Sequence, residues 1–437
     1  MVIILAPSLP ARDFKPMKRP RILLSAYYFS PYKGSESAVG WNVATRLAKH
    51  NDVTVLTGDV AESCPHRADL QRWQAEHIPT PGLAVEYIPP DASISRYECW
   101  HNKPGLWFLW YKAYKKWQRL AYQRARQLHA DKPFDLTHHL TVIGYREPGY
   151  LWQLPIPFVW GPINGADGIP WPYYPALGRS CIPPLLRDLC NRMQMRLPGR
   201  HHRAARAAKH IWSVTPADYR MVKNLWGHDT ELMIETGCTP ELTAGPRVRL
   251  ESEPIRLVYS GLFLARKALP LLFQALRHLP SKFSWHLDIL GDGPCRDAWQ
   301  KQAITLGINS GITWHGQLPR DHALTVMRLG HILVHPSLKE GTPHVVLEAL
   351  ALGMPVLCHD ACGMGTAVND TCGIKVPLLN PATSIAGFAH AIECFMNDSE
   401  LLTRLSTGAM ARAHELSWDN KVNQISNVYK KILSQNI

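Results

Sequence analysis

The chain has 437 residues, of which 46% are hydrophobic and 19% charged, a composition typical of folded proteins and not of disordered ones. Its length exceeds that of one ordinary core and predicts two domains. No apolar run approaches the roughly 20 residues of a membrane span, and the apolar segment 1–6 lacks the basic region of a signal peptide. The formal net charge of +13 predicts an anionic partner: a membrane surface, a nucleic acid or a phosphorylated substrate.

The first segments of the chain alternate between strand and helix patterns. Residues 21–26 read as a buried strand, apolar spacing predicts a helix over 35–49, and a second strand follows at 53–57. Ser35 is the expected N-cap of this helix, and Glu36 suits its positive end. The opening lacks the GxGxxG fingerprint of dinucleotide-binding proteins, which disfavours a dehydrogenase.

Aromatic residues interleave with lysines and arginines over residues 107–127, and a second basic stretch follows at 196–209. If helical, the first segment has an aromatic stripe with a basic flank, which is typical of an interfacial helix on anionic lipid. The alternatives are an ordinary amphipathic helix with its aromatic side chains in the core, and stacking on nucleic-acid bases. We favour the membrane surface, and no nucleic-acid-binding motif accompanies the charge.

Two histidines stand at the end of the next predicted strand, over residues 135–141. His138 or His139 in that position has the chemistry to donate a hydrogen bond to a sugar hydroxyl or to shuttle a proton. The alternative is a hydrogen-bonded structural histidine. A further strand at 156–160 precedes a glycine-rich loop that contains Asn164.

The second half of the chain repeats the alternation. Residues 239–254 carry proline and lack periodicity, which predicts an interdomain linker. After the strand at 256–261 comes the basic pair Arg266-Lys267, which is unfavourable at a helix start but suited to neutralising a diphosphate leaving group. Another strand, at 285–291, ends in a tight glycine turn. The pattern of both halves predicts two doubly wound parallel sheets.

The most informative stretch follows a short buried strand at 332–335. Glu340 falls in the turn after that strand, and Glu348 lies about two helical turns further on. Open parallel sheets bind ligands at the carboxyl ends of their strands, and the first amides of a helix favour a phosphate. Such a site would bind a nucleotide-sugar at three points. The first amides of the helix would bind a phosphate, and the carboxylates of Glu340 and Glu348 would accept hydrogen bonds from sugar hydroxyls.

This stretch resembles the retaining nucleotide-sugar glycosyltransferases of family four, which carry two glutamates separated by seven residues in the same order. The resemblance implies the GT-B fold, in which two Rossmann-like domains face a central cleft. It also implies that Glu340 lies near the hydroxyls of the donor sugar and that Glu348 binds the ribose of the nucleotide.

Other positions match the family less completely. Lys267 matches the lysine of the family's phosphate clamp, whereas Leu262 replaces an arginine that frequently follows the glycine, so it is open whether Arg266 supplies that charge. The resemblance places the loop Gly34-Ser35-Glu36 near the donor phosphates and the acceptor, although many relatives have two glycines there. It also places His138 or His139 beside the transferred sugar, without a choice between them.

The residues predicted to form the site fall into three groups. The predicted catalytic residues are His138, His139, Glu340, Lys267 and Arg266. The predicted donor-binding residues are Gly34, Gly261, Lys267, Gly291, Gly341, Thr342, His344 and Glu348. The predicted acceptor-side residues are Ser35, Glu36 and Asn164. The family needs no metal, the ten cysteines include no CxxC pair, and we expect no metal or other cofactor.

The predicted domain organisation follows from these assignments: an N-terminal extension at 1–20, an acceptor domain at 21–238, the linker at 239–254, a nucleotide-sugar domain at 255–415, and a terminal helix at 416–437 that returns to the first domain. We expect transfer of a hexose from a UDP- or GDP-linked donor to a saccharide acceptor, lipid-linked, in cell-surface or exopolysaccharide synthesis. The expected location is the cytoplasm, on the anionic inner face of the plasma membrane, without a nucleic-acid partner. The alternatives are another GT-B activity, an epimerase or a phosphorylase, and a non-catalytic basic membrane-binding protein.

Overall fold

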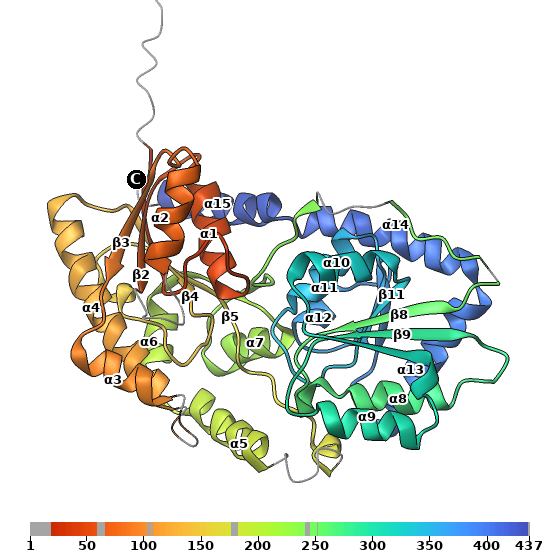
Figure 1. The fold of residues 1–437 in the computed structure, drawn as a ribbon. Helices are drawn as coiled ribbons and strands as arrows, with labels where there is room; N and C mark the ends of the chain where they lie inside the picture. Colours follow the sequence, from red (N-terminus) through yellow and green to blue (C-terminus); the bar gives the residue numbers. More distant parts are fainter. Residues whose placement is uncertain are drawn as a thin grey trace, which may run out of the picture.

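The chain forms two parallel sheets with helices on both faces, and the two units lie side by side (Figure 1). The computed structural model describes residues 19–58, 66–101, 103, 106, 108–175, 182–240, 245–250 and 252–435. The predicted extension falls outside these residues except for its last two, and so does Trp107 of the predicted aromatic stripe. The predicted fold class, two doubly wound parallel sheets, is confirmed.

The N-terminal sheet has seven strands in the order β3-β2-β1-β4-β5-β6-β7, all parallel. Its central strands are buried along nearly their whole length because helices cover both faces, which explains their continuous apolar runs. The strands are β1 (Arg21–Ala26), β2 (Asp52–Gly58), β3 (Leu83–Ile88), β4 (Leu136–Thr141), β5 (Phe158–Ile163), β6 (Ala208–Ser213) and β7 (Glu231–Leu232).

The C-terminal sheet has six parallel strands in the order β10-β9-β8-β11-β12-β13. The chain order reverses between β8 and β11, and ligands of open parallel sheets bind at such a switch point. The strands are β8 (Ile255–Ser260), β9 (Trp285–Leu290), β10 (Ile312–Gly316), β11 (Ile332–His335), β12 (Val356–His359) and β13 (Gly373–Val376).

Helices cover both sheets. Those of the N-terminal unit are α1 (Glu36–Leu47), α2 (His66–Glu76), α3 (Ala92–His101), α4 (Leu109–Asp131), α5 (Ile182–Arg196), α6 (Arg200–Ala207) and α7 (Pro216–Arg220). Those that follow are α8 (Leu269–Arg277), α9 (Arg296–Thr305), α10 (Arg320–Leu329), α11 (His344–Ala351), α12 (Cys362–Ala367), α13 (Pro381–Asn397), α14 (Ser399–Glu415) and α15 (Trp418–Ser434). None of the helices among the described residues is both long and apolar enough to cross a bilayer.

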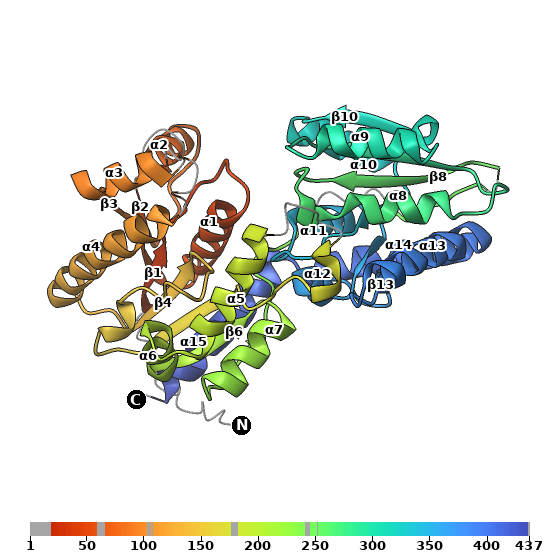
Figure 2. The same ribbon diagram turned by 90° about the horizontal axis from the view of Figure 1, so that it is seen from below.

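The last helix, α15, crosses from the C-terminal unit to the N-terminal one and packs against α1 (Figures 1 and 2). The hydroxyl of Tyr429 on α15 lies 2.6 Å from Nδ1 of His138 on β4. At the other end of α15, the ring of Trp418 packs so closely on Gly237 that a side chain there would collide with it. Both contacts lie on the N-terminal unit, so α15 returns the chain from α14 of the C-terminal unit to the N-terminal one.

The aromatic side chains of α4 face the core. Tyr114 and Trp117 are each 1% exposed, and both rings contact the ring of Tyr27. The basic residues of α4 lie on its outer flank, where Arg124 pairs with Glu86. The interpretation of this stripe as a lipid-facing surface is therefore wrong, and the alternative of an amphipathic helix with its aromatic residues in the core is right.

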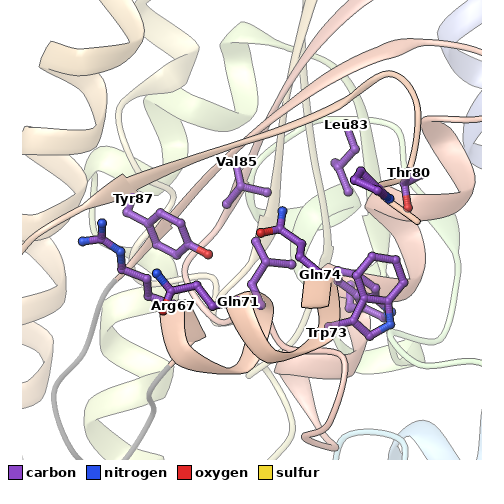
Figure 3. A pocket seen from close by; sticks show the side chains of 11 residues that line it. Arg67, Gln71, Trp73, Gln74, Thr80, Leu83, Val85 and Tyr87 are labelled. Carbon is purple, nitrogen blue, oxygen red and sulfur yellow. The ribbon is translucent and has the colours of Figure 1, made fainter. Parts of the chain in front are cut away.

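A hollow lies on the N-terminal unit, between α2, the strand β3 and Trp41 of α1 (Figure 3). Arg67, Trp73 and Tyr87 are among the side chains that line it. None of the predicted site residues lines this hollow. Residues 245–250 of the predicted linker lie on the C-terminal unit, where Arg247 donates a 3.0 Å hydrogen bond to the carbonyl of Leu352.

Candidate active site

Glu340 is the centre of a compact charge cluster in the turn between β11 and α11. Its Oε1 lies 2.6 Å from Nζ of Lys267, 2.6 Å from the guanidinium of Arg266 and 2.7 Å from Oγ of Ser337. Burial acts to raise the pKa of Glu340, but the two cations outweigh it and the net shift is downward. Glu340 is therefore ionised at neutral pH. The structure brings together three of the predicted catalytic residues, and Arg266 supplies a charge that Leu262 does not.

The two cations come from the short turn between β8 and α8, where Lys267 is buried and Arg266 is partly exposed. Gly261 lies beside Lys267, and a Cβ there would be 3.7 Å from the lysine Nζ. A side chain at Gly291 would collide with the carbonyl of Gly261, so the ends of β8 and β9 touch through their backbones. Both glycines therefore allow the close backbone packing beneath the side chains of Arg266 and Lys267.

The start of α11 is in contact with the N-terminal unit. The amide of Thr342 donates a 2.6 Å hydrogen bond to Oε1 of Glu235, which belongs to the segment after β7. A side chain at Gly341 would collide with Glu235 and with Nδ2 of Asn164. Asn164, predicted on the acceptor side, thus lies at this contact between the two units. Sequence reasoning missed Glu235, although it precedes Thr236-Gly237 at the end of the last strand of the first unit.

Glu235 is a buried carboxylate. Burial raises its pKa, and the hydrogen bond from Thr342 opposes the shift. The buried ammonium of Lys421 on α15 donates to the carbonyl of the neighbouring residue Ile234, and burial lowers its pKa to about 7. The carboxylate of Glu235 thus accepts a hydrogen bond from the amide of Thr342, just before α11. An anionic ligand is favoured at this end of a helix.

Glu348 lies on α11 in a cavity of about 480 Å³ between the two units. Gly34 and Ser35 line this cavity from the N-terminal side, and His344 lines it from the same helix as Glu348. Oε1 of Glu348 lies 2.9 Å from Nε of Arg320, an exposed residue that sequence reasoning missed. Burial raises the pKa of Glu348, and the charge of Arg320 opposes this shift. The predicted ribose-binding and loop residues therefore share one cavity.

The loop before α1 differs from its predicted form. Ser35 is the N-cap residue of α1, as predicted, but it has φ 56° and ψ −141° and its hydroxyl makes no capping hydrogen bond. Oε1 of Glu36 accepts a 3.1 Å hydrogen bond from the amide of Ile143, in the loop after β4. Burial raises the pKa of Glu36 to about 7, and the charge of Glu235 adds to the shift.

Neither histidine of β4 reaches the cavity. His138 is fully buried, with Nδ1 bonded to the hydroxyl of Tyr429 and Nε2 2.7 Å from the carbonyl of Gly161. His139 is 1% exposed and packs beside Gly149. Burial lowers their pKa values to about 3 and about 4, respectively, so both rings are neutral. Both are interior residues in this structure, and that one of them contacts the sugar stays a prediction.

Lys339, next to Glu340, carries a second connection that sequence reasoning missed. Its Nζ lies 2.6 Å from Oδ1 of Asp188 on α5, and both side chains are largely buried. The other oxygen of Asp188 accepts 2.9 Å hydrogen bonds from the amide of Ile169 and the hydroxyl of Tyr174. Asp188 and Lys339 are 151 residues apart in the chain, so no local sequence pattern predicts that they pair.

The cations, the two glutamates and the start of α11 lie at the carboxyl ends of the C-terminal strands and face the first unit. Two doubly wound parallel units with a ligand site between them define the GT-B class of folds. The sequence model of the family described as "Glycosyl transferases group 1" matches residues 246–412. Residues 246–412, in the C-terminal unit, thus match a glycosyltransferase family.

Curated relatives share this region. The chain is 28% identical over 189 residues to the alpha-D-kanosaminyltransferase of Streptomyces kanamyceticus, an alignment that spans 43% of this chain and 48% of that protein. It is 29% identical over 205 residues to the lipopolysaccharide core biosynthesis glycosyltransferase LpsE of Rhizobium meliloti, spanning 46% of this chain and 56% of the relative. The alignments thus cover about half of the length of these relatives.

Solved structures share the whole architecture. Sucrose-phosphate synthase from Thermosynechococcus elongatus superposes with a TM-score of 0.64 at 17% identity, covering 95% of this chain and 100% of the other. Anabaena HepE in complex with UDP and glucose superposes with a TM-score of 0.59 at 15% identity, covering 94% and 100%. At these identities the likeness establishes the fold alone.

Proposed function

We propose that the chain is a retaining glycosyltransferase that moves a hexose from a nucleoside-diphosphate sugar to a saccharide acceptor. The observation that carries the proposal is the cluster in which Glu340 holds Arg266 and Lys267 at the switch point of a group 1 glycosyltransferase domain. HepE was solved with UDP and glucose, and LpsE acts in lipopolysaccharide core biosynthesis. HepE supports a nucleotide-sugar donor, which we propose to be linked to UDP or GDP, and LpsE supports a role in cell-surface polysaccharide synthesis.

In the proposed reaction, the diphosphate of the donor lies against Lys267, Arg266 and the start of α11, and Glu348 accepts hydrogen bonds from the ribose. The bond between the anomeric carbon and the diphosphate oxygen breaks while the acceptor hydroxyl forms a bond on the same face of the sugar. The departing phosphate oxygen takes the proton of that hydroxyl. The two cations neutralise the charge that develops on the diphosphate, which lowers the barrier. We propose no metal in this reaction.

We also propose where the reaction occurs. The formal charge of +13 supports an anionic surface as a partner, and we place the protein in the cytoplasm on the inner face of the plasma membrane. The acceptor in this proposal is a saccharide carried on a lipid. The proposal includes no nucleic-acid partner.

The test separates donor binding from transfer. A panel of UDP-, GDP-, ADP- and dTDP-linked sugars is titrated into the wild-type protein by calorimetry, and transfer is followed with the donor that binds. Glu348→Ala should raise the donor dissociation constant about tenfold, because a hydrogen bond to a charged group is lost. Lys267→Ala should instead lower the turnover number by about 100-fold, because the leaving group loses a cation.

Two further variants make the result interpretable. Lys301→Ala removes an exposed lysine of α9 and should leave binding and turnover unchanged. Arg266→Gln changes a partly exposed side chain and tests the same cluster if Lys267→Ala lowers the melting temperature. Absence of binding for every nucleotide-sugar would refute the proposal, and conversion of the donor without an acceptor would indicate an epimerase instead.

A further inference from the structure

Helix α5 exposes a stripe of large apolar residues, whereas the polar residues Asp188 and Asn191 are buried. Ile182, Leu186, Leu189 and Met193 recur at spacings of four, three and four residues and form one stripe along the helix, with exposed fractions between 41% and 64%. A helix on the surface of a globular protein normally buries its apolar stripe. An exposed apolar stripe of this kind is typical of a surface that binds a protein, a ligand or a membrane.

The buried face of α5 is explained by the candidate active site. Asp188 holds Lys339 beside Glu340, and the buried Asn191 accepts hydrogen bonds from Tyr145 and Arg146. The amide of Asn191 also donates a 2.7 Å hydrogen bond to the carbonyl of Gly165, in the loop that carries Asn164. Helix α5 is thus fixed to the loops of the site, near the boundary between the two units (Figure 2). Its outer stripe takes no part in these contacts.

A cavity of about 700 Å³ lies between this helix and the beginning of α4. We call it the α4–α5 cavity. Its apolar walls include Phe108, Leu186, Leu197 and Pro198, and two arginines also line it, Arg146 and Arg187. Both Phe108 and Leu197 are substantially exposed. The carboxylate in the lining, Glu147, is already paired with Arg200.

The two arginines make one end of the cavity cationic and leave the other end apolar. Nε of Arg187 lies 3.9 Å from Oδ1 of Asp188, the same oxygen that binds Lys339, the neighbour of Glu340. The cationic part of the cavity is therefore the part that adjoins the site, and the apolar part continues into the exposed stripe of α5. A molecule that fits this arrangement has an anionic group next to the sugar to be extended and a hydrocarbon chain behind it.

We propose that the α4–α5 cavity binds the hydrocarbon chain of a lipid-linked acceptor, whose phosphate lies against Arg187 and Arg146. This inference rests on the proposed function and deepens it, because it assigns the acceptor lipid to particular residues. It also moves the lipid contact from the buried aromatic residues of α4 to α5 and to Phe108 and Tyr111, which stand at the beginning of the aromatic stripe and line the cavity.

The probe is dodecyl phosphate, titrated by calorimetry into the full-length protein below the concentration at which the probe forms micelles. Dodecyl maltoside, which lacks the charge, and inorganic phosphate, which lacks the chain, are the comparison ligands. Dodecyl phosphate should bind about tenfold more tightly than dodecyl maltoside, and inorganic phosphate should not bind measurably. Arg187→Gln should remove most of the difference between the two detergents.

The variants separate the cavity from the surface of the helix. Phe108→Ser with Leu197→Asn alters the cavity wall, whereas Leu189→Asn with Met193→Asn alters the stripe outside the cavity lining. The two pairs have similar exposure in the folded chain, so both are expected to fold. The first pair should weaken dodecyl phosphate binding about tenfold, and the second should leave it within about twofold.

Three outcomes would overturn the inference. Unchanged affinity in the cavity pair would show that the chain binds elsewhere, and equal losses in both pairs would indicate adsorption of the helix to any apolar surface, including a bilayer. A change of oligomeric state in the cavity pair, without loss of dodecyl phosphate binding, would assign the surface to a second copy. Nucleotide-sugar binding is measured on the same samples: if it persists while dodecyl phosphate does not bind, this inference fails and the proposed function stands.

Discussion

Ser35 has a backbone conformation that side chains disfavour, with φ 56° and ψ −141°. We predict that Ser35→Gly raises the free energy of unfolding by about 1 kcal/mol, because glycine adopts positive φ without a steric penalty. Chemical denaturation measures the change. Ala44→Gly, in the middle of α1, is the matched control and should lower the stability by at least about 1 kcal/mol. A loss of stability in Ser35→Gly would contradict the assigned backbone strain.

Glu36 titrates near neutral pH in the folded chain, because burial raises its pKa from 4.5 to about 7. The folded state holds this proton at pH values where the unfolded state has lost it. The stabilising contribution is therefore complete below pH 4.5 and is lost as the pH rises to about 7. We predict that Glu36→Gln matches the wild type at low pH and exceeds its stability by on the order of 3 kcal/mol above neutrality.

The measurement is the difference in unfolding free energy between Glu36→Gln and the wild type at several pH values. A difference is needed because the buried rings of His138 and His139 also take up protons on unfolding over part of the same range, in both proteins. Their contribution has the opposite sign, since burial lowers their pKa values. A difference that stays constant from pH 4 to pH 8 would show that Glu36 has no raised pKa.

At the scale of elements, α5 is held to the Glu340 loop by the ion pair of Asp188 and Lys339. We predict that Asp188→Asn lowers the free energy of unfolding by about 3 kcal/mol, because it leaves the buried ammonium of Lys339 without its counter-charge. The double variant Asp188→Asn with Lys339→Met should recover most of that loss. Denaturation of the two single variants and the double variant completes the cycle. Additive losses would show that the pair does not couple α5 to the loop.

The strands and the turn that carries Glu340 were predictable from the sequence because their signals are local. An apolar run, a turn and a helical spacing lie within about 20 residues, and the resemblance of a second stretch, residues 261–267, added Lys267 and left the role of Arg266 open. The pair Asp188 and Lys339 was not predictable, because its members are 151 residues apart and neither stands in a motif. The spacing of apolar residues indicates that a helix has an apolar and a polar face. It does not show which part of the protein, or which partner, covers each face.

The histidines of β4 and the aromatic residues of α4 illustrate that limit. The sequence predicted His138 and His139 at a strand end, whereas they lie in the middle of β4. Successive residues of a strand point to opposite faces, and the sequence does not show what covers either face. His138 is covered by α15, whose Tyr429 comes 291 residues later. The aromatic stripe of α4 is real, but it faces Tyr27 and the core. In both cases a distant element determined the environment.

At the scale of the whole molecule, the two units are joined at more than the linker. Helix α15 starts at the C-terminal unit and ends on the N-terminal sheet, and Glu235 reaches from the first unit to the amide of Thr342 in the second. The first contact is extensive and buried, whereas the second is a single hydrogen bond at the site itself. A change in the angle between the units would therefore break the contact at Glu235 before it dislodged α15.

This contact leads to a prediction about ligand affinity. The carboxylate of Glu235 occupies an amide at the start of α11, where we propose that the diphosphate of the donor binds. Two negative groups cannot share that amide, so a bound diphosphate must displace Glu235. We predict that Glu235→Ala binds UDP roughly tenfold more tightly than the wild type, because no charge-assisted hydrogen bond has to be broken first. Calorimetry with UDP measures the change.

The control is Glu231→Ala, which removes an exposed carboxylate of β7 four residues earlier and should leave the affinity for UDP unchanged. Small-angle scattering of Glu235→Ala without ligand should show a larger radius of gyration than the wild type, because a contact between the units is lost. If Glu235→Ala instead binds UDP more weakly, the carboxylate assists the ligand and does not compete with it. The start of α11 would then be closed to the diphosphate, and the donor would have to be placed on Lys267 and Arg266 alone.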